Sequence, residues 1–112
     1  MLFPDHFMAV RATVDAGRED AFNRWYDGEH IPDAENMLPG CFGASRYKVT
    51  DRDRSHQYIA LYAFRNAADL EAAFASAEIK ELIRRYDEAI GLFSTRTRTT
   101  YARVFQLEKP SS

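Results

Sequence analysis

The sequence contains a single cysteine, Cys41, and this scarcity excludes an intrachain disulfide. A lone thiol suits a reducing compartment, so we expect a cytoplasmic protein, with Cys41 as a buried and inert thiol. The N-terminal residues Met1–His6 lack a charged segment followed by a long apolar run, and no stretch approaches the ~20 apolar residues of a membrane span. We therefore expect neither a secretion signal nor a membrane as partner.

The sequence also lacks an excess of charge of either sign. Fifteen lysines and arginines face 17 aspartates and glutamates, which gives a formal net charge of −2. Without a basic excess to contact phosphates, nucleic acid is not expected as a partner. Phosphate-loop, dinucleotide-binding and Gly-x-Ser-x-Gly motifs are absent as well. With 46% hydrophobic and 29% charged residues, the 112 residues are typical of one globular domain spanning 1–112.

What the sequence does contain is a regular series of apolar patterns. They predict strands at 7–14, 41–50, 57–64 and 93–107, and helices at about 18–29 and 67–90. Asn66 is expected to cap the second helix, Ser76 and Ala77 mark a point where it can break, and Gly91 should end it.

This order of elements predicts a ferredoxin-like βαββαβ fold, an α+β architecture with a four-stranded antiparallel sheet and helices on one face. The first and third strands are the most apolar and should be central, whereas the charged second and fourth strands should be edges. Two helices can cover only one face, yet the central strands are apolar on both. A second copy of the sheet would cover the other face, so we expect a two-fold homodimer.

One stretch, Arg24–Asp33, points to chemistry. The residues that share one stripe of a helix there are Phe22, Trp25, Tyr26, Glu29 and His30. Pro32 disfavours helical geometry at Ile31, so the helix should bend or end just past His30. The stripe would then hold an imidazole at the end of an aromatic wall, with carboxylates nearby.

The polar residues of this stretch each have two interpretations. His30 is either a general acid/base, suited to proton transfer near neutral pH, or a helix-end residue that interacts with the helix dipole. Asp33 either orients the imidazole by accepting its other N–H or is an acidic first-turn residue of a short helix after Pro32. Glu29 is a weaker candidate for orienting His30 and a better one for pairing with a nearby arginine.

The candidate substrate-binding residues are Trp25, Tyr26, Glu29, Tyr58, Tyr62 and Tyr86. Trp25 and Tyr26 would form a wall for a flat ligand, although a large aromatic such as Trp25 is more often part of a core. The tyrosines of the third strand share one face, where they either line a cavity or bond across a dimer interface. A metal site is not expected, because zinc sites usually use more nitrogen and sulfur ligands than one histidine beside two carboxylates supplies.

The stretch Trp25–Asp33, followed by Pro39-Gly40 and Arg46-Tyr47, resembles the EthD-like branch of the dimeric α/β-barrel proteins. Those proteins carry an aromatic pair followed by His-x-Pro at the end of the first helix. The resemblance implies the ferredoxin-like fold and the dimer. It does not choose an activity, because the superfamily includes ring cyclases, lactone isomerases, decarboxylases, cofactor-free monooxygenases and haem-degrading relatives.

Two classes of function follow. The first is a small cofactor-independent enzyme that holds a flat, oxygenated organic substrate (aromatic, polyketide-like or lactone) between helices and sheet. His30 would move a proton there during cyclisation, isomerisation or decarboxylation. A cofactor-free monooxygenase is the alternative enzyme. The second class is a non-catalytic binding or interaction protein in which the stripe only packs.

Overall fold

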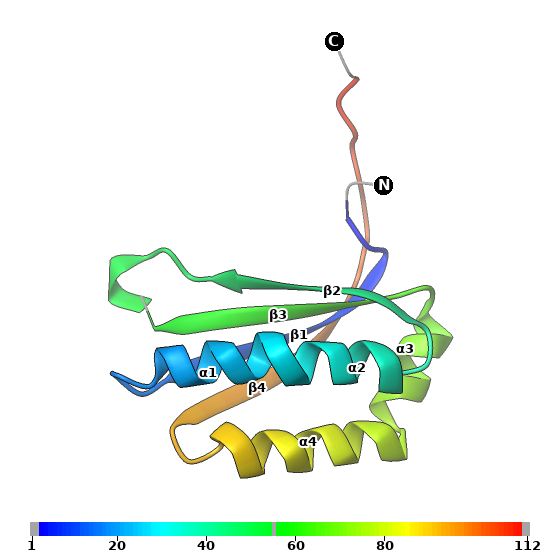
Figure 1. Cartoon of the computed structure of the whole chain (residues 1–112). Coiled ribbons are helices and arrows are strands. Elements are labelled where there is room, and N and C mark those ends of the chain that lie inside the picture. The colour runs from blue at the N-terminus through cyan, green and yellow to red at the C-terminus, as the bar shows by residue number, and fades with distance from the viewer. Residues whose placement is uncertain (1–2, 55, 111–112) are drawn as a thin grey trace.

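The computed structural model describes residues 3–54 and 56–110, and its elements follow the predicted order (Figure 1). They are β1 (His6–Val14), α1 (Glu19–Trp25), η1 (Tyr26–His30), α2 (Ile31–Met37), β2 (Cys41–Lys48), η2 (Arg52–Arg54), β3 (Gln57–Phe64), α3 (Ala67–Phe74), α4 (Ala77–Ile90) and β4 (Ser94–Ala102). The four strands form one antiparallel sheet in the order β2-β3-β1-β4. The α+β ferredoxin-like fold, with β1 and β3 in the centre, is confirmed.

The edge strands are shorter than predicted. β4 ends at Ala102 instead of residue 107, because its only neighbour, β1, begins at His6, which lies opposite Ala102. One further backbone bond joins Arg103 N–H to the carbonyl of Asp5, and the chain then leaves the sheet. β2 likewise ends at Lys48, two residues early.

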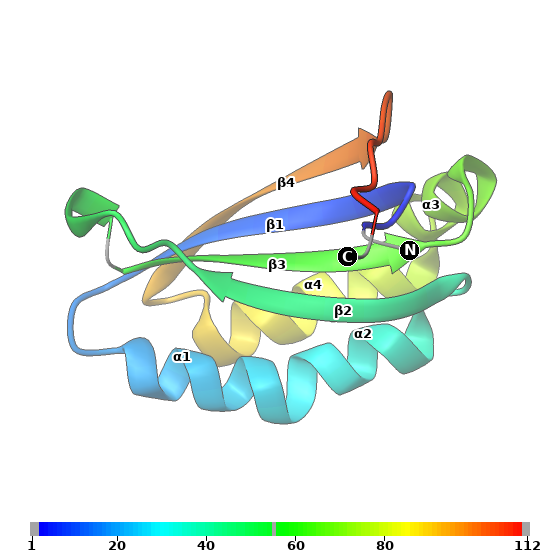
Figure 2. The ribbon, with the colours of Figure 1, turned by 90° about the horizontal axis from the view of Figure 1, so that it is seen from above.

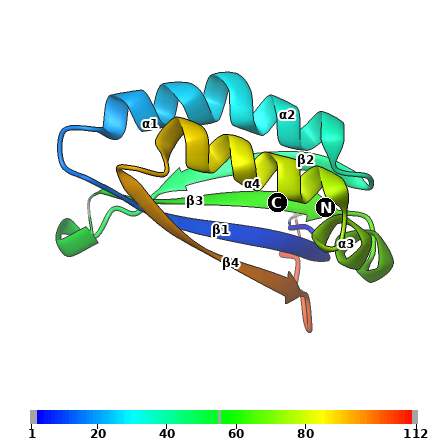
Figure 3. The same cartoon turned by 90° about the horizontal axis from the view of Figure 1, so that it is seen from below.

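The helices lie on one face of the sheet, and the core lies between the helices and the sheet (Figures 1 and 3). Every second residue of the central strands faces the helices and is buried: Met8, Val10, Ala12 and Val14 on β1, and Tyr58, Ala60, Tyr62 and Phe64 on β3. The intervening residues face away, and Figure 2 shows that no helix covers that side. Of the helices in the described ranges, none combines the length and apolarity needed to cross a bilayer.

The sequence predicted that the first helix would bend or end just past His30, and the structure shows that it does not end there. Ile31 keeps helical dihedral angles, and the chain continues through Pro32 to Met37. The helical hydrogen bonds here span one residue more than in an α-helix, so that the Ile31 N–H donates to the carbonyl of Tyr26, five residues back. Pro32 then falls in the first turn of α2, where a missing N–H is tolerated.

The second predicted helix is two helices joined at a break. Asn66 caps α3 by accepting a 2.8 Å hydrogen bond from the Asp69 N–H, as predicted. Ser76 caps α4 in the same way, with its Oγ 3.1 Å from the Ile79 nitrogen. The break directs α3 toward one end of the sheet while α4 runs beside α2 (Figure 3). This arrangement leaves room for a groove between α3 and β4.

Candidate functional site

His30 is buried, with 8% of its surface exposed, because the wide turn η1 directs it at the sheet. Tyr26, at the other end of η1, is buried on the same side, whereas Glu29 is exposed. The widened turn therefore separates the predicted stripe into an inward part and an outward part.

A small cavity of about 20 Å³, measured as the space open to the centre of a water molecule, lies between the helices and the sheet. Its walls come from β1, η1, α2, β3, α4 and β4. They are Met8, Val10, Tyr26, His30, Ala34, Leu38, Tyr62, Ile79, Leu82, Ile83, Tyr86, Arg96 and Arg98. A space of this size admits a water molecule or a diatomic gas, but no aromatic ring.

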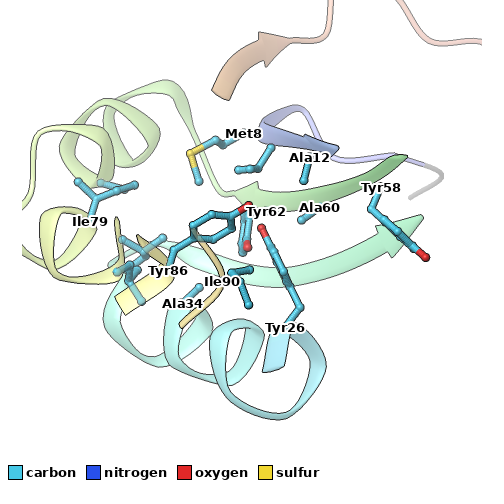
Figure 4. Packing of buried hydrophobic residues seen from close by; sticks show 14 of the residues in the cluster. Met8, Ala12, Tyr26, Ala34, Tyr58, Ala60, Tyr62, Ile79, Tyr86 and Ile90 are labelled. Carbon is cyan, nitrogen blue, oxygen red and sulfur yellow. The ribbon is translucent and has the colours of Figure 1, made fainter. Parts of the chain in front are cut away.

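Aromatic rings surround the imidazole of His30. Trp25 stacks on it with ring centroids 4.9 Å apart, and Tyr26 meets it edge-on at the same distance. Tyr62 from β3 and Tyr86 from α4 approach at 6.5 Å and 6.1 Å. Figure 4 shows these three tyrosines converging from different elements. Contacts with flat, apolar rings remove water from the imidazole on several sides.

This environment favours the neutral imidazole. Burial, and after it the positive charge of Arg96, lower the pKa of His30 to about 4, while the negative charge of Asp33 opposes both effects. Its Nδ1 atom is shielded from solvent and has no hydrogen-bond partner among the described residues, and the same holds for the Tyr62 hydroxyl. Burial also raises the pKa of Tyr26 to about 12 and that of Tyr62 well above its usual value, so both phenols keep their protons.

The low pKa of His30 should make the protein less stable in acid. Between the folded-state value of about 4 and the usual 6.5, the unfolded chain binds a proton that the folded chain does not. The free energy of unfolding therefore rises with pH in this window, and the contribution of His30 is lost as the pH falls from about 6.5 to about 4. The free energy of unfolding lost in this window is on the order of 3 kcal/mol.

Urea titrations at pH 7 and pH 4 give the change in the free energy of unfolding between the two pH values. This change should be larger for wild type than for His30→Gln, and the difference between the two proteins measures the contribution of His30. His56→Gln, which removes an exposed imidazole, should behave like wild type. Equal pH dependence in all three proteins would contradict the buried neutral state of His30.

Two arginines at the cavity were missed as site residues, because their strand was interpreted as a charged edge. Arg96 and Arg98 lie opposite Ala12 and Val10 of β1, on the face that the helices cover. Arg96 lies 3.7 Å above the ring of Tyr86 and bonds to Asp87 at 3.0 Å. Their spacing of two residues places both on one face of a strand, but only the register with β1 shows which face.

Two predicted polar site residues lie elsewhere. Asp33 forms no hydrogen bond with His30; its carboxylate is 3.0 Å from Arg85 of α4, because the helix continues past Pro32 and does not turn Asp33 back toward the imidazole. Glu29 is exposed and away from the cavity. In the described part of the chain, no three His, Cys, Asp or Glu side chains gather as a metal site would require.

The aromatic candidates divide differently. Tyr26, Tyr62 and Tyr86 line the cavity, and Trp25 contacts His30 from outside it. Tyr58 points away (Figure 4), and its hydroxyl donates to Glu19 at 2.6 Å. The prediction that Tyr58 binds substrate is therefore not supported by its position. The thiol of Cys41 is half-buried, and burial raises its pKa.

No protein-family model matches this sequence, and no curated protein sequence matches it either. Solved structures do match, over most of the chain. SnoaB, a cofactor-independent oxygenase from Streptomyces nogalater, is similar with a TM-score of 0.66 at 13% identity, over 94% of this chain and 99% of SnoaB. HapK from Hahella chejuensis is similar with a TM-score of 0.66 at 10% identity, over 95% of this chain and 99% of HapK.

An EthD family protein from Bacillus halodurans has a TM-score of 0.61 at 14% identity, over 84% of this chain and 96% of that protein. Identities this low establish likeness of fold. The resemblance predicted from Trp25–Asp33 is thus confirmed for the architecture: the chain has the ferredoxin-like fold that an EthD family protein and a cofactor-independent oxygenase share.

Proposed function

We propose that this protein is a small enzyme in which His30 takes a proton from an oxygenated organic substrate. The observation that carries the proposal is a buried, neutral imidazole beside a cavity, with a nitrogen that has no partner among the described residues. A buried polar atom without a partner is costly in a core, and such atoms are often functional. A neutral imidazole can accept a proton, which is the first requirement of a general base.

The second feature that supports the proposal is the hydroxyl of Tyr62. It makes no well-formed hydrogen bond to another described residue, although the Tyr26 hydroxyl is near enough to interact with it, and the raised pKa keeps its proton in place. A substrate C–H beside a carbonyl leaves an enolate when it loses a proton, and a fixed O–H donor stabilises that oxyanion. His30 and Tyr62 therefore supply the base and the donor that enolisation needs. Enolisation is the step common to isomerisation, cyclisation and decarboxylation of flat oxygenated compounds.

The test is proton exchange in a model substrate. Anthrone is flat, and the protons of its methylene group become acidic because loss of one gives an aromatic oxyanion. In deuterated buffer without oxygen, the protein should exchange these protons faster than an equal concentration of free imidazole, as measured by NMR. A rate no greater than that of free imidazole, for anthrone and for a β-keto lactone, would refute the base role.

A second candidate, a cofactor-free monooxygenase, is favoured by the size of the cavity. A volume of about 20 Å³ admits dioxygen but not the organic substrate, which would have to approach from outside. SnoaB, which has a similar fold, is a cofactor-independent oxygenase. In such a reaction, the methylene of anthrone would become a carbonyl while one O₂ is reduced to water and the new C=O oxygen. An oxygen electrode distinguishes the candidates, since proton transfer alone consumes no O₂.

The same proposal includes a homodimer formed through the bare face of the sheet. A hollow of about 320 Å³ on that face is lined by apolar residues of the central strands, such as Phe7 and Leu61, with Tyr47 and Tyr101 at its sides. Monomeric proteins rarely expose an apolar patch of this kind. The C-terminal segment, with exposed Val104, Phe105 and Leu107, projects on this side of the sheet (Figure 1). A second copy on this face would cover the patch and could contact the segment.

A further inference from the structure

Arg98 separates the His30 cavity from a second, larger hollow. It is half-buried on β4 and lines both spaces. The larger one is a groove of about 800 Å³ between α3 and β4, and its apolar walls include Ala67, Leu70 and Phe74. Volumes of 300–1,000 Å³ are typical of sites for small organic ligands. The molecule thus has a ligand-sized groove that meets the water-sized cavity at one guanidinium group.

The charge of Arg98 is not balanced by an acidic partner. No carboxylate of the described residues lies within ion-pairing distance of it, whereas Arg96, on the same face of β4, pairs with Asp87. The two guanidiniums repel each other, and burial together with Arg96 lowers the pKa of Arg98. The negative charge of Asp87 acts on Arg98 only from beyond ion-pairing distance. A half-buried cation without an ion-pair partner is unfavourable, and a bound anion would relieve that cost.

We propose that Arg98 binds the carboxylate of a flat aromatic acid whose rings lie in the groove between α3 and β4, with the carboxylate end of the molecule beside the His30 cavity that Arg98 also lines. This inference rests on the proposed function, for which it names the substrate class. Arginine matches a carboxylate with two parallel N–H donors, which fixes orientation as well as position. The other titratable groups of the groove are Glu71, His6 and Tyr101, and the negative charge of Glu71 disfavours a second carboxylate at the α3 side.

Binding of this acid would also activate the base. The charged groups that act on His30 are Arg96, Arg98 and Arg46, which lower its pKa, and Asp33, which raises it. A carboxylate on Arg98 offsets one of the positive charges, so the pKa of His30 should rise toward the pH at which the enzyme works. A site without substrate would then hold a weak base, and a loaded site a stronger one.

The experiment compares 2-naphthoate with 2-naphthamide, which has the same rings without the charge. By calorimetry, wild type should bind naphthoate more tightly than naphthamide. Arg98→Gln should weaken naphthoate binding by about tenfold to a hundredfold, the effect of losing a charge-assisted hydrogen bond, and leave naphthamide unchanged. Arg24→Gln removes the same charge from an exposed position of α1 and is the matched control. NMR of labelled histidine should show the pKa of His30 rising when naphthoate binds.

Equal affinities of wild type for the two probes would overturn the proposal, even if Arg98→Gln failed to fold. Unchanged naphthoate binding in a folded Arg98→Gln protein would overturn it as well. Failure of the proposed function has a separate signature: naphthoate binding would still depend on Arg98 while anthrone exchange stayed at the rate of free imidazole. The opposite pattern, exchange without preference for the anion, would refute the substrate class alone.

Discussion

The His30→Ala variant is expected to exchange the methylene protons of anthrone about 10²–10⁴-fold more slowly than wild type, the usual share of general acid–base catalysis. The reason is that alanine removes the acceptor nitrogen and leaves the tyrosine donors in place. The imidazole is enclosed by Trp25 and Tyr26, so its loss also opens a space in the core. Activity must therefore be measured well below the melting temperature of the variant, with circular dichroism to confirm folding.

Two further variants make the result specific. His30→Gln keeps a polar side chain that cannot take up a proton near neutral pH, so it should be as slow as His30→Ala. His56→Ala removes an exposed imidazole and should keep the wild-type rate. If His30→Ala kept more than about a tenth of the activity, a loss below the range expected for a general base, another group would have to be the base.

Leu61→Asp is expected to convert the proposed dimer into a monomer. Leu61 lies on β3 at the centre of the bare sheet face, and a two-fold axis would place both copies of the new carboxylate in the interface. Burying an unpaired charge commonly costs about 3–5 kcal/mol, so association should weaken by at least about a hundredfold. Light scattering at micromolar concentration should give twice the 12.9 kDa mass of one chain for wild type and that mass for the variant.

The matched control is Leu92→Asp, which introduces the same charge at a leucine with 96% of its surface exposed, in the turn before β4. It should remain dimeric. A wild-type protein of monomer mass would refute the dimer, and a Leu61→Asp protein of dimer mass would show that the copies associate through another face.

The fold could be predicted because its signals are local and periodic. The nearly continuous apolar run of β3 defines both its ends and its central place in the sheet, and Asn66 marks the start of α3 through its own hydrogen bond. The ends of β4 could not be found in this way. Val104, Phe105 and Leu107 continue a strand pattern beyond Ala102, but a strand exists only where a neighbour supplies hydrogen bonds, and β1 has ended there.

The site was predictable only in part, for the same reason. Helical spacing correctly brought Tyr26 and His30 together, since both belong to one turn. The position of Asp33 could not be predicted in this way. A proline normally ends a helix, and no residue type indicates the widened turn that accommodates Pro32. Arg96 and Arg98 reach the cavity through a register between distant strands, which no local pattern specifies.

The widened turn η1 has a consequence for how such a site can be gained or lost. One residue beyond the regular helical count lies between Tyr26 and Ile31, and it rotates everything after it by roughly 100°, the angle between successive residues of an α-helix. Deleting a single codon within the turn would restore an ordinary helix with the same composition and nearly the same length. His30 and the residues after it would then keep roughly their present directions, because the residue removed is the one that the wide turn accommodates. If the same residues were instead wound as a regular α-helix, the chain after Tyr26 would be turned by that angle. The direction of His30 is thus linked to how one turn of the helix accommodates an extra residue.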